Sequence, residues 1–138
     1  MADPPLTGGC LCGAVRFEVR EPLGAAGYCH CTRCQRRTGA AASPQARVAP
    51  GSVAVLEGAD LIREYLPPEG FAKAFCAACG ASLWSRDPAN AEPFSVRLGA
   101  FDSDPGVRPS HHQFVDYAAP WEPIPDDGLP RYPESSRG

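Results

Sequence analysis

Seven cysteines, gathered in three short clusters, constrain this 138-residue chain more than any other feature. The clusters are Cys10-Leu11-Cys12-Gly13, Cys29-His30-Cys31-Thr32-Arg33-Cys34 and Cys76-Ala77-Ala78-Cys79-Gly80. Cysteines in closely spaced pairs are typical of tetrahedral zinc sites, in which a tight turn directs two sulfurs at one ion. The odd total argues against a complete set of disulfides. We therefore interpret the cysteines as metal ligands.

The first and third clusters each supply half of a closed site. Cys76 and Cys79 have the spacing of a zinc knuckle, and Gly80 relieves backbone strain where the turn closes. Such a pair needs two further ligands from a distant loop, and Cys10 and Cys12 are suitable. We predict that these four cysteines hold a structural Zn²⁺.

The middle cluster offers three thiols and no fourth. Three protein ligands with one open position describe a catalytic zinc site, in which water or substrate completes the tetrahedron. Spacing alone leaves His30 open as a fourth ligand to Cys29, Cys31 and Cys34. Side chains alternate along an extended segment, however, so His30 should point away from the two flanking sulfurs. We predict that any chemistry belongs to this triplet.

Three other interpretations of the cysteines stay open. One is a disulfide framework, although Cys-x-Cys residues in a strand lie near the distance limit for bridging. Another is a redox Cys-x-x-Cys motif at Cys31 or Cys76, although neither pair is expected to open a helix after a strand in a βαβ unit. The third is a single structural zinc, with the middle cluster as ordinary thiols.

Sixteen prolines and fourteen glycines leave little room for long helices. Short segments with strand-like patterns, bounded by Gly, Pro or Asp, recur at intervals of roughly ten residues. They cover residues 14–20, 52–56, 61–66, 72–76, 82–85, 94–98 and 113–117. This spacing predicts one mainly β domain of sandwich or barrel type. A short helix is expected at residues 32–38, ending before Gly39.

The composition limits the partners we expect. A formal net charge of −3 and a pI near 5.5 lack the clustered Lys and Arg of a nucleic-acid-binding face. The first nine residues show no secretory pattern, and no segment approaches the roughly 20 apolar residues of a membrane span. We therefore expect a cytoplasmic protein without a nucleic-acid or membrane partner, in a compartment that keeps thiols reduced.

A few other residues are candidates for packing or for a site. His111 or His112 could contact the metal or act as an acid or base, although exposed or core positions are more frequent for histidine. Tyr28 could line the open site or simply pack. Pro120-Trp121 is expected to anchor the extended C-terminal tail to the core.

In this order, the clusters resemble the family of glutathione-dependent formaldehyde-activating enzymes (GFA), which includes the centromere protein V relatives. The likeness is carried by residues 8–15, 29–40 and 75–80, with further matches at 99–102 and 120–121. It implies a β-tent of antiparallel sheets with two zinc sites: a structural one on Cys10, Cys12, Cys76 and Cys79, and a catalytic one on Cys29, Cys31 and Cys34. The expected organisation is a flexible N-terminus at 1–7, a GFA-type zinc-binding domain at 8–125 and a proline-rich C-terminal tail at 126–138.

The resemblance also implies an activity, the addition of glutathione to formaldehyde to give S-(hydroxymethyl)glutathione, classed by its reverse direction as a carbon–sulfur lyase. An open Zn²⁺ position could favour the thiolate or polarise the aldehyde oxygen. Arg33, Arg36 and Arg37 could pair with the two carboxylates of glutathione, or could form a solvated helix face with loose ion pairs. The alternative function is a non-catalytic, zinc-stabilised binding module.

Overall fold

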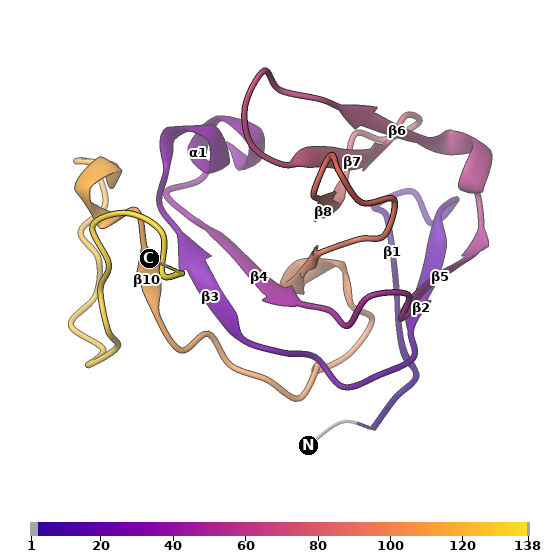
Figure 1. Cartoon of the computed structure of the whole chain (residues 1–138), viewed down its shortest axis with the longest axis horizontal. Coiled ribbons are helices and arrows are strands. Elements are labelled where there is room, and N and C mark those ends of the chain that lie inside the picture. Colours follow the sequence, from indigo (N-terminus) through magenta and orange to yellow (C-terminus); the bar gives the residue numbers. More distant parts are fainter. Residues whose placement is uncertain (1–2, 138) are drawn as a thin grey trace.

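The computed structural model describes residues 3–137, whose strands form two sheets (Figure 1). The smaller sheet is antiparallel, in the order β1 (Leu6–Gly9), β2 (Arg16–Val19), β5 (Val53–Glu57). The larger has the order β10-β3-β4-β9-β8-β7-β6, and only its β10–β3 pair is parallel among the described strands. Its bounds are β3 (Ala26–Cys29), β4 (Ser43–Arg47), β6 (Ile62–Tyr65), β7 (Ala72–Cys76), β8 (Ser82–Arg86), β9 (Ser95–Arg97) and β10 (His112–Gln113). The predicted mainly β fold of antiparallel sheets is confirmed.

The core lies between the two sheets. Phe17 of β2 is fully buried, and its ring meets the ring of Trp84 of β8 edge-on, with centroids 5.6 Å apart. Phe101 approaches Phe17 from another side at 6.0 Å. Edge-to-face aromatic pairs at these distances add attraction to the burial of apolar surface. Leu83 and Val96 complete the contact from the larger sheet.

Most of the predicted strands are present, but the prediction missed three observed strands and placed one strand wrongly. The prediction for residues 72–76 matches β7, and those for 14–20, 52–56, 61–66, 82–85 and 94–98 overlap observed strands. The missed strands β1, β3 and β4 carry Gly or Pro, which weakens the alternating pattern. Residues 113–117 are not a strand: β10 ends at Gln113, and Phe114 adopts a left-handed conformation, φ 58°, that starts the 3-10 turn η3 (Val115–Tyr117).

The predicted helix is α1 (Thr32–Thr38), and it ends as expected at Gly39, which is left-handed with φ 70°. The Cys31 side chain caps its N-terminus by accepting a hydrogen bond from the Cys34 N–H at 3.4 Å. The Cys31-x-x-Cys34 pair therefore opens a helix that follows strand β3. Because β3 and β4 are antiparallel, the arrangement is still not a βαβ unit. Two further 3-10 turns are η1 (Ala59–Leu61) and η2 (Leu98–Ala100).

Residues near both ends of the chain depart from two expectations. Leu6 and Thr7, placed in a flexible segment, belong to β1, and Leu6 is buried. Trp121 does not anchor the tail, since it is 65% exposed. The tail instead runs beside β10, and the Tyr132 N–H donates to the His112 carbonyl at 2.8 Å. Residues 1, 2 and 138 of the predicted terminal segments lie outside the described part. Within residues 3–137, no helix has the length and apolar character needed to cross a membrane.

Candidate metal centre

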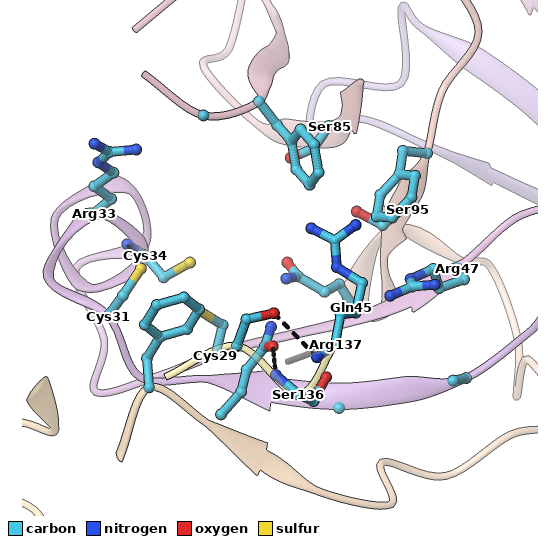
Figure 2. A pocket seen from close by; sticks show the side chains of 18 of the residues that line it. Cys29, Cys31, Arg33, Cys34, Gln45, Arg47, Ser85, Ser95, Ser136 and Arg137 are labelled. Carbon is cyan, nitrogen blue, oxygen red and sulfur yellow. Dashed lines mark hydrogen bonds between the residues drawn. The ribbon is translucent and has the colours of Figure 1, made fainter. Parts of the chain in front are cut away.

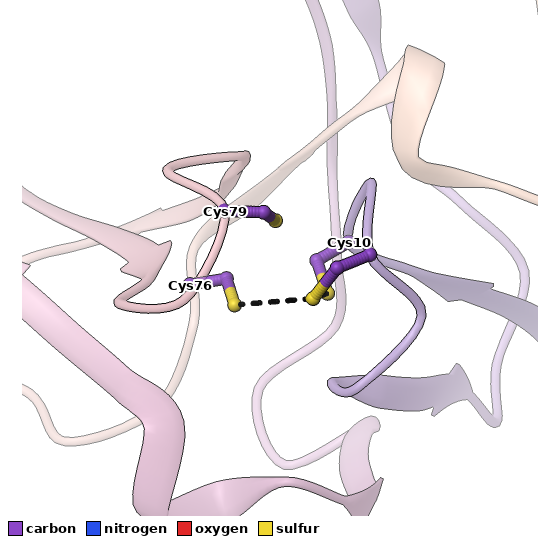
Figure 3. Close-up of side chains that lie close together, drawn as sticks. Cys10, Cys76 and Cys79 are labelled. Atoms are coloured by element: carbon purple, nitrogen blue, oxygen red, sulfur yellow. Dashed lines mark hydrogen bonds between the residues drawn. The ribbon is translucent and has the colours of Figure 1, made fainter.

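The first and third cysteine clusters meet between the two sheets (Figure 3). Cys10 and Cys12 come from the β1–β2 connection, and Cys76 and Cys79 from the turn between β7 and β8. Their four Sγ atoms lie within 4.8 Å of one another, with Cys10–Cys12 at 3.6 Å and Cys12–Cys76 at 4.0 Å. Tetrahedral zinc with Zn–S bonds of about 2.3 Å places its sulfurs about 3.8 Å apart. The four sulfurs therefore fit one tetrahedral ion.

Local backbone geometry aims these sulfurs. Gly80 closes the second turn with φ 78° and donates its N–H to the Cys76 carbonyl at 2.7 Å. The Val15 N–H donates to Cys10 Sγ at 3.2 Å. Burial alone would raise the pKa of Cys10, but this donor and the hydrogen bonds with neighbouring sulfurs lower it to about 6. At Cys12 a backbone hydrogen bond with Ala14 lowers the pKa, but the bonds shared with Cys10 and the other sulfurs raise it to about 11. The cluster therefore favours the thiolate that metal binding requires at Cys10 but not at Cys12.

The middle cluster also converges. Cys29 ends β3, Cys31 caps α1 and Cys34 lies in its first turn, and their three Sγ atoms are within 4.8 Å of one another. Hydrogen bonds from the Cys29 and Cys31 thiols lower the pKa of Cys34, and Arg37 acts in the same direction. The hydrogen bonds of Cys29 with Cys31 and Cys34, together with burial, raise the pKa of Cys29. The cluster therefore favours one thiolate on Cys34, accepting hydrogen bonds from its neighbours.

His30 is not part of either cysteine group. Its buried ring points away from the sulfurs, as predicted, and its Nε2 lies 2.8 Å from His112 Nδ1. His112 Nε2 in turn lies 2.8 Å from Asp127 Oδ2, which ties the cysteine loop to the tail. Tyr28 packs on His112 with ring centroids 5.0 Å apart and does not line the cavity described below. His111, in contrast, does line it.

A cavity of about 560 Å³ opens beside the three-cysteine cluster (Figure 2). Cys29, Cys31 and Cys34 form part of its lining. Six cationic side chains also line it, and no Asp or Glu is among its lining residues within the described part of the chain. The cations are Arg33, Arg37, Arg47, Lys73, Arg97 and Arg137. A concave site with charges of one sign focuses the potential and attracts anions.

Arg97 is the most deeply buried of these cations. Its guanidinium donates to Gln45 Oε1 at 2.9 Å, to Ser85 Oγ at 2.8 Å and to Ser82 Oγ at 3.1 Å, and no carboxylate among the described residues accepts from it. Burial, followed by the nearby charge of Arg37, lowers the pKa of Arg97 to about 9. A buried cation held only by neutral groups is costly, and an anionic ligand would offset that cost.

Comparison with known proteins agrees with this geometry. The family model described as "Glutathione-dependent formaldehyde-activating enzyme" matches residues 5–117. This chain belongs to that family. A Halomonas elongata protein, named provisionally as a glutathione-dependent formaldehyde-activating enzyme, is 30% identical over 105 residues, which cover 72% of this chain and 67% of that protein. A crystal structure of a Rhodobacter sphaeroides protein is similar at 30% identity with a TM-score of 0.55, covering 75% of this chain and 92% of that one.

In this member of the glutathione-dependent formaldehyde-activating family, the three predicted arginines have different surroundings. Arg33 lines the cavity, and its Nη1 donates to the Glu69 carbonyl at 2.7 Å. Arg37 also lines it and donates to Ser82 Oγ at 2.8 Å and Ser43 Oγ at 2.6 Å. Arg36 is not among its lining residues but borders a second cavity of about 770 Å³.

The sequence analysis missed four of the six cavity cations. Arg47, Lys73, Arg97 and Arg137 stand singly in β4, β7, β9 and the tail, with no motif around them. The acidic net charge of the whole chain also concealed the local concentration of positive charge. Pairing of β4 with β9 brings two of them together, because Gln45 lies opposite Arg97 and Arg47 opposite Ser95.

Proposed function

We propose that this protein binds Zn²⁺ at both cysteine clusters and adds glutathione, or a similar thiol, to formaldehyde or another small aldehyde. The observation that carries this proposal is the convergence of Cys29, Cys31 and Cys34 on a cavity that, within residues 3–137, is lined by six cations and by no Asp or Glu. Family membership and the provisional name of the Halomonas elongata relative support the choice of substrates. The activity would be that of a carbon–sulfur lyase, read in reverse, in the cytoplasm.

The sulfurs divide into two roles. Cys10, Cys12, Cys76 and Cys79 can saturate one ion and brace the two sheets, because a closed set of four thiolates leaves no position for a substrate. Cys29, Cys31 and Cys34 would hold the second ion with one position free. A Zn²⁺ there would favour the thiolate form of an incoming thiol and polarise an aldehyde oxygen.

The residues of the cavity would bind and orient the substrates. Glutathione carries two carboxylates, and guanidinium groups bind carboxylates through paired hydrogen bonds. Arg47 and Arg97 lie on paired strands in the cavity wall, and Lys73 adds a third positive charge. The rings of Phe71 and Phe94, 4.8 Å apart, give the same wall an apolar part. This combination holds the charged ends of a thiol while keeping water away from its sulfur.

The proposed reaction needs no other reactant. The thiol sulfur forms a bond to the aldehyde carbon, the carbonyl π electrons move to oxygen, and the proton lost by the thiol ends on the new hydroxyl group. Negative charge therefore develops on oxygen during the addition. Preorganised positive charge near that oxygen lowers the barrier, because it requires no reorganisation during the reaction.

Two cysteine variants test the proposal. The wild type should contain two Zn²⁺ per chain and should form S-(hydroxymethyl)glutathione faster than the uncatalysed mixture, as followed by NMR. Cys34→Ser should keep the fold, lose one Zn²⁺ and return the rate to background. Cys10→Ser should lose the other Zn²⁺ and much of the stability, because it opens the site that joins the sheets.

The alternative, a zinc-stabilised binding module, predicts different results. The wild type would then hold two Zn²⁺ but show no rate above background. Cys34→Ser would then unfold the protein, because the second Zn²⁺ would only stabilise the fold. A Cys34→Ser variant that folds, lacks the second Zn²⁺ and still catalyses at the wild-type rate would show that the chemistry is not at this cluster.

A further inference from the structure

The tail segment 131–137 is attached to one wall of the cavity. The Tyr132 N–H donates to the His112 carbonyl at 2.8 Å, and the Phe114 N–H donates to the Glu134 carbonyl at 2.9 Å. The Ser136 N–H then donates to the Gln113 side chain at 3.1 Å (Figure 2). These bonds hold the segment against β10 and leave its next residue directed at the cavity. We call residues 131–137 the strap.

Arg137 reaches the other wall. Its guanidinium carbon lies 5.4 Å from the ring centroid of Phe71, which precedes β7, and 5.2 Å from that of Phe94, which precedes β9. Figure 2 shows its guanidinium extending into the cavity from the strap. The strap therefore crosses the cavity from β10 to the Phe71–Phe94 pair. Contacts between a cation and aromatic rings at these distances are attractive but modest.

A second guanidinium group lies close to that of Arg137. Arg47 also lies over the Phe94 ring, 4.7 Å from its centroid, so two guanidinium groups share one aromatic side chain. Burial and the charge of Arg137 lower the pKa of Arg47. No Asp or Glu lines the cavity within the described residues, so no side-chain carboxylate there pairs with either guanidinium. An anion placed between them would replace repulsion by two attractive contacts.

We propose that Arg137 contacts the anionic end of a ligand in this cavity, and that binding of such a ligand holds the strap in its place across the cavity. Arg137 is then a specificity-determining residue that favours carboxylate-bearing thiols over neutral ones. That the ligand is a thiol rests on the proposed function, whereas the contact between Arg137 and an anion does not. The two ideas can therefore fail separately.

Two probes separate charge from thiol chemistry. S-methylglutathione keeps both carboxylates but has no free thiol, and 2-mercaptoethanol has a thiol but no carboxylate. Binding of the first is measured by calorimetry on the zinc-loaded full chain. Binding of the second is followed through the visible spectrum of the cobalt-substituted protein. The proteins compared are wild type, Arg137→Gln, Arg137→Lys and the control Arg20→Gln, which alters an exposed arginine paired with Glu18 outside the cavity.

Arg137→Gln should weaken S-methylglutathione binding about tenfold, the usual effect of losing a charge-assisted hydrogen bond. Arg137→Lys should recover part of the affinity, and Arg20→Gln should bind like wild type. The response to 2-mercaptoethanol should be equal in all four proteins. Amide hydrogen exchange at residues 132–136 should slow when S-methylglutathione is added to wild type but not to Arg137→Gln.

Equal affinity of wild type and Arg137→Gln for S-methylglutathione would overturn the proposal, and so would unchanged exchange in the strap on binding. Failure of S-methylglutathione to bind wild type would also overturn it, whatever thiols do. If neither 2-mercaptoethanol nor glutathione changed the cobalt spectrum while Arg137→Gln still weakened S-methylglutathione binding, the thiol-addition function would fail and the strap proposal would stand. Thermal melting of all four proteins establishes that each variant is folded.

Discussion

Replacing His112 with Ala should destabilise the protein by about 2.5–5.5 kcal/mol. His112 is 2% exposed and lies at the centre of a hydrogen-bonded chain between His30 and Asp127, with both contacts at 2.8 Å. Tyr28 stacks on its other side at a 16° interplanar angle. These hydrogen bonds join the Cys29-His30-Cys31 loop to the tail, so their loss should destabilise the whole fold.

The magnitude follows from three losses. His30 is buried, and its Nε2 would lose its partner, which costs about 1–3 kcal/mol. The bond to Asp127 is worth about 1 kcal/mol, because that carboxylate is partly exposed and water can replace the imidazole. Loss of the stacked contact with Tyr28 removes about 0.5–1.5 kcal/mol. A water entering the vacated space would bring the total toward the lower end.

Urea unfolding with saturating Zn²⁺ measures the effect, since a fixed metal concentration keeps the binding contribution constant. The matched control is His111→Ala. The His111 ring makes an edge-on contact with Tyr132 at 5.9 Å, packs against Gly27 and has no hydrogen-bond partner among the described residues, so its replacement should cost about 1 kcal/mol or less. If His112→Ala cost no more than His111→Ala, the hydrogen bonds from His30 through His112 to Asp127 would contribute nothing to stability, contrary to this prediction.

Two further predictions concern positions outside the cavity. Gly58 and Gly51 both have a φ of 77°, so replacing either with Ala strains the backbone equally. At Gly58, however, the new Cβ would also collide with the Ala14 carbonyl oxygen. Gly58→Ala should therefore lower the free energy of unfolding in urea by about 1–3 kcal/mol more than Gly51→Ala. Equal costs would show that the backbone yields there. A hydrogen bond from Arg16 lowers the pKa of Asp102. The charged carboxylate therefore stabilises the fold at pH values above its usual pKa of about 3.9, and this stabilisation is lost as the pH falls through the lowered pKa. Asp102→Asn should thus be less stable than wild type at neutral pH, with the gap closing in acid, and a gap independent of pH would contradict this pairing.

The features that could be predicted from the sequence are local ones. Strand 72–76 alternates side chains on two faces, and helix 32–38 ends where Gly39 can turn left-handed. Strands β1, β3 and β4 were missed because their Gly and Pro residues remove the alternation, and neighbouring strands impose the extended conformation instead. The prediction that Trp121 anchors the tail was wrong for a related reason. The tail is held by backbone hydrogen bonds to β10, and any residue type except proline can donate such bonds, so the sequence does not indicate them.

The cysteine clusters show how much of a site spacing alone can determine. The two residues between Cys76 and Cys79 restrict the turn so strongly that both could be expected to bind one ion, and ligand counting suggested Cys10 and Cys12 as their partners. The structure brings the same four together. Spacing therefore predicts which sulfurs act together within each cluster, because that depends on short-range geometry, whereas the contact of Cys10 and Cys12 with Cys76 and Cys79 depends on how the two sheets pack.

The character of the cavity beside them was decided only by the tertiary structure. Arg47 and Arg97 stand in strands far apart in the sequence, and they share a wall because the register of β4 and β9 places Gln45 opposite Arg97 and Arg47 opposite Ser95. A shift of one residue in that register would turn these side chains to the other face. Arg137 reaches them only through the path of the strap. Coulomb interactions depend on distance in space, so an acidic chain can assemble a strongly positive cavity without any positively charged motif in its sequence.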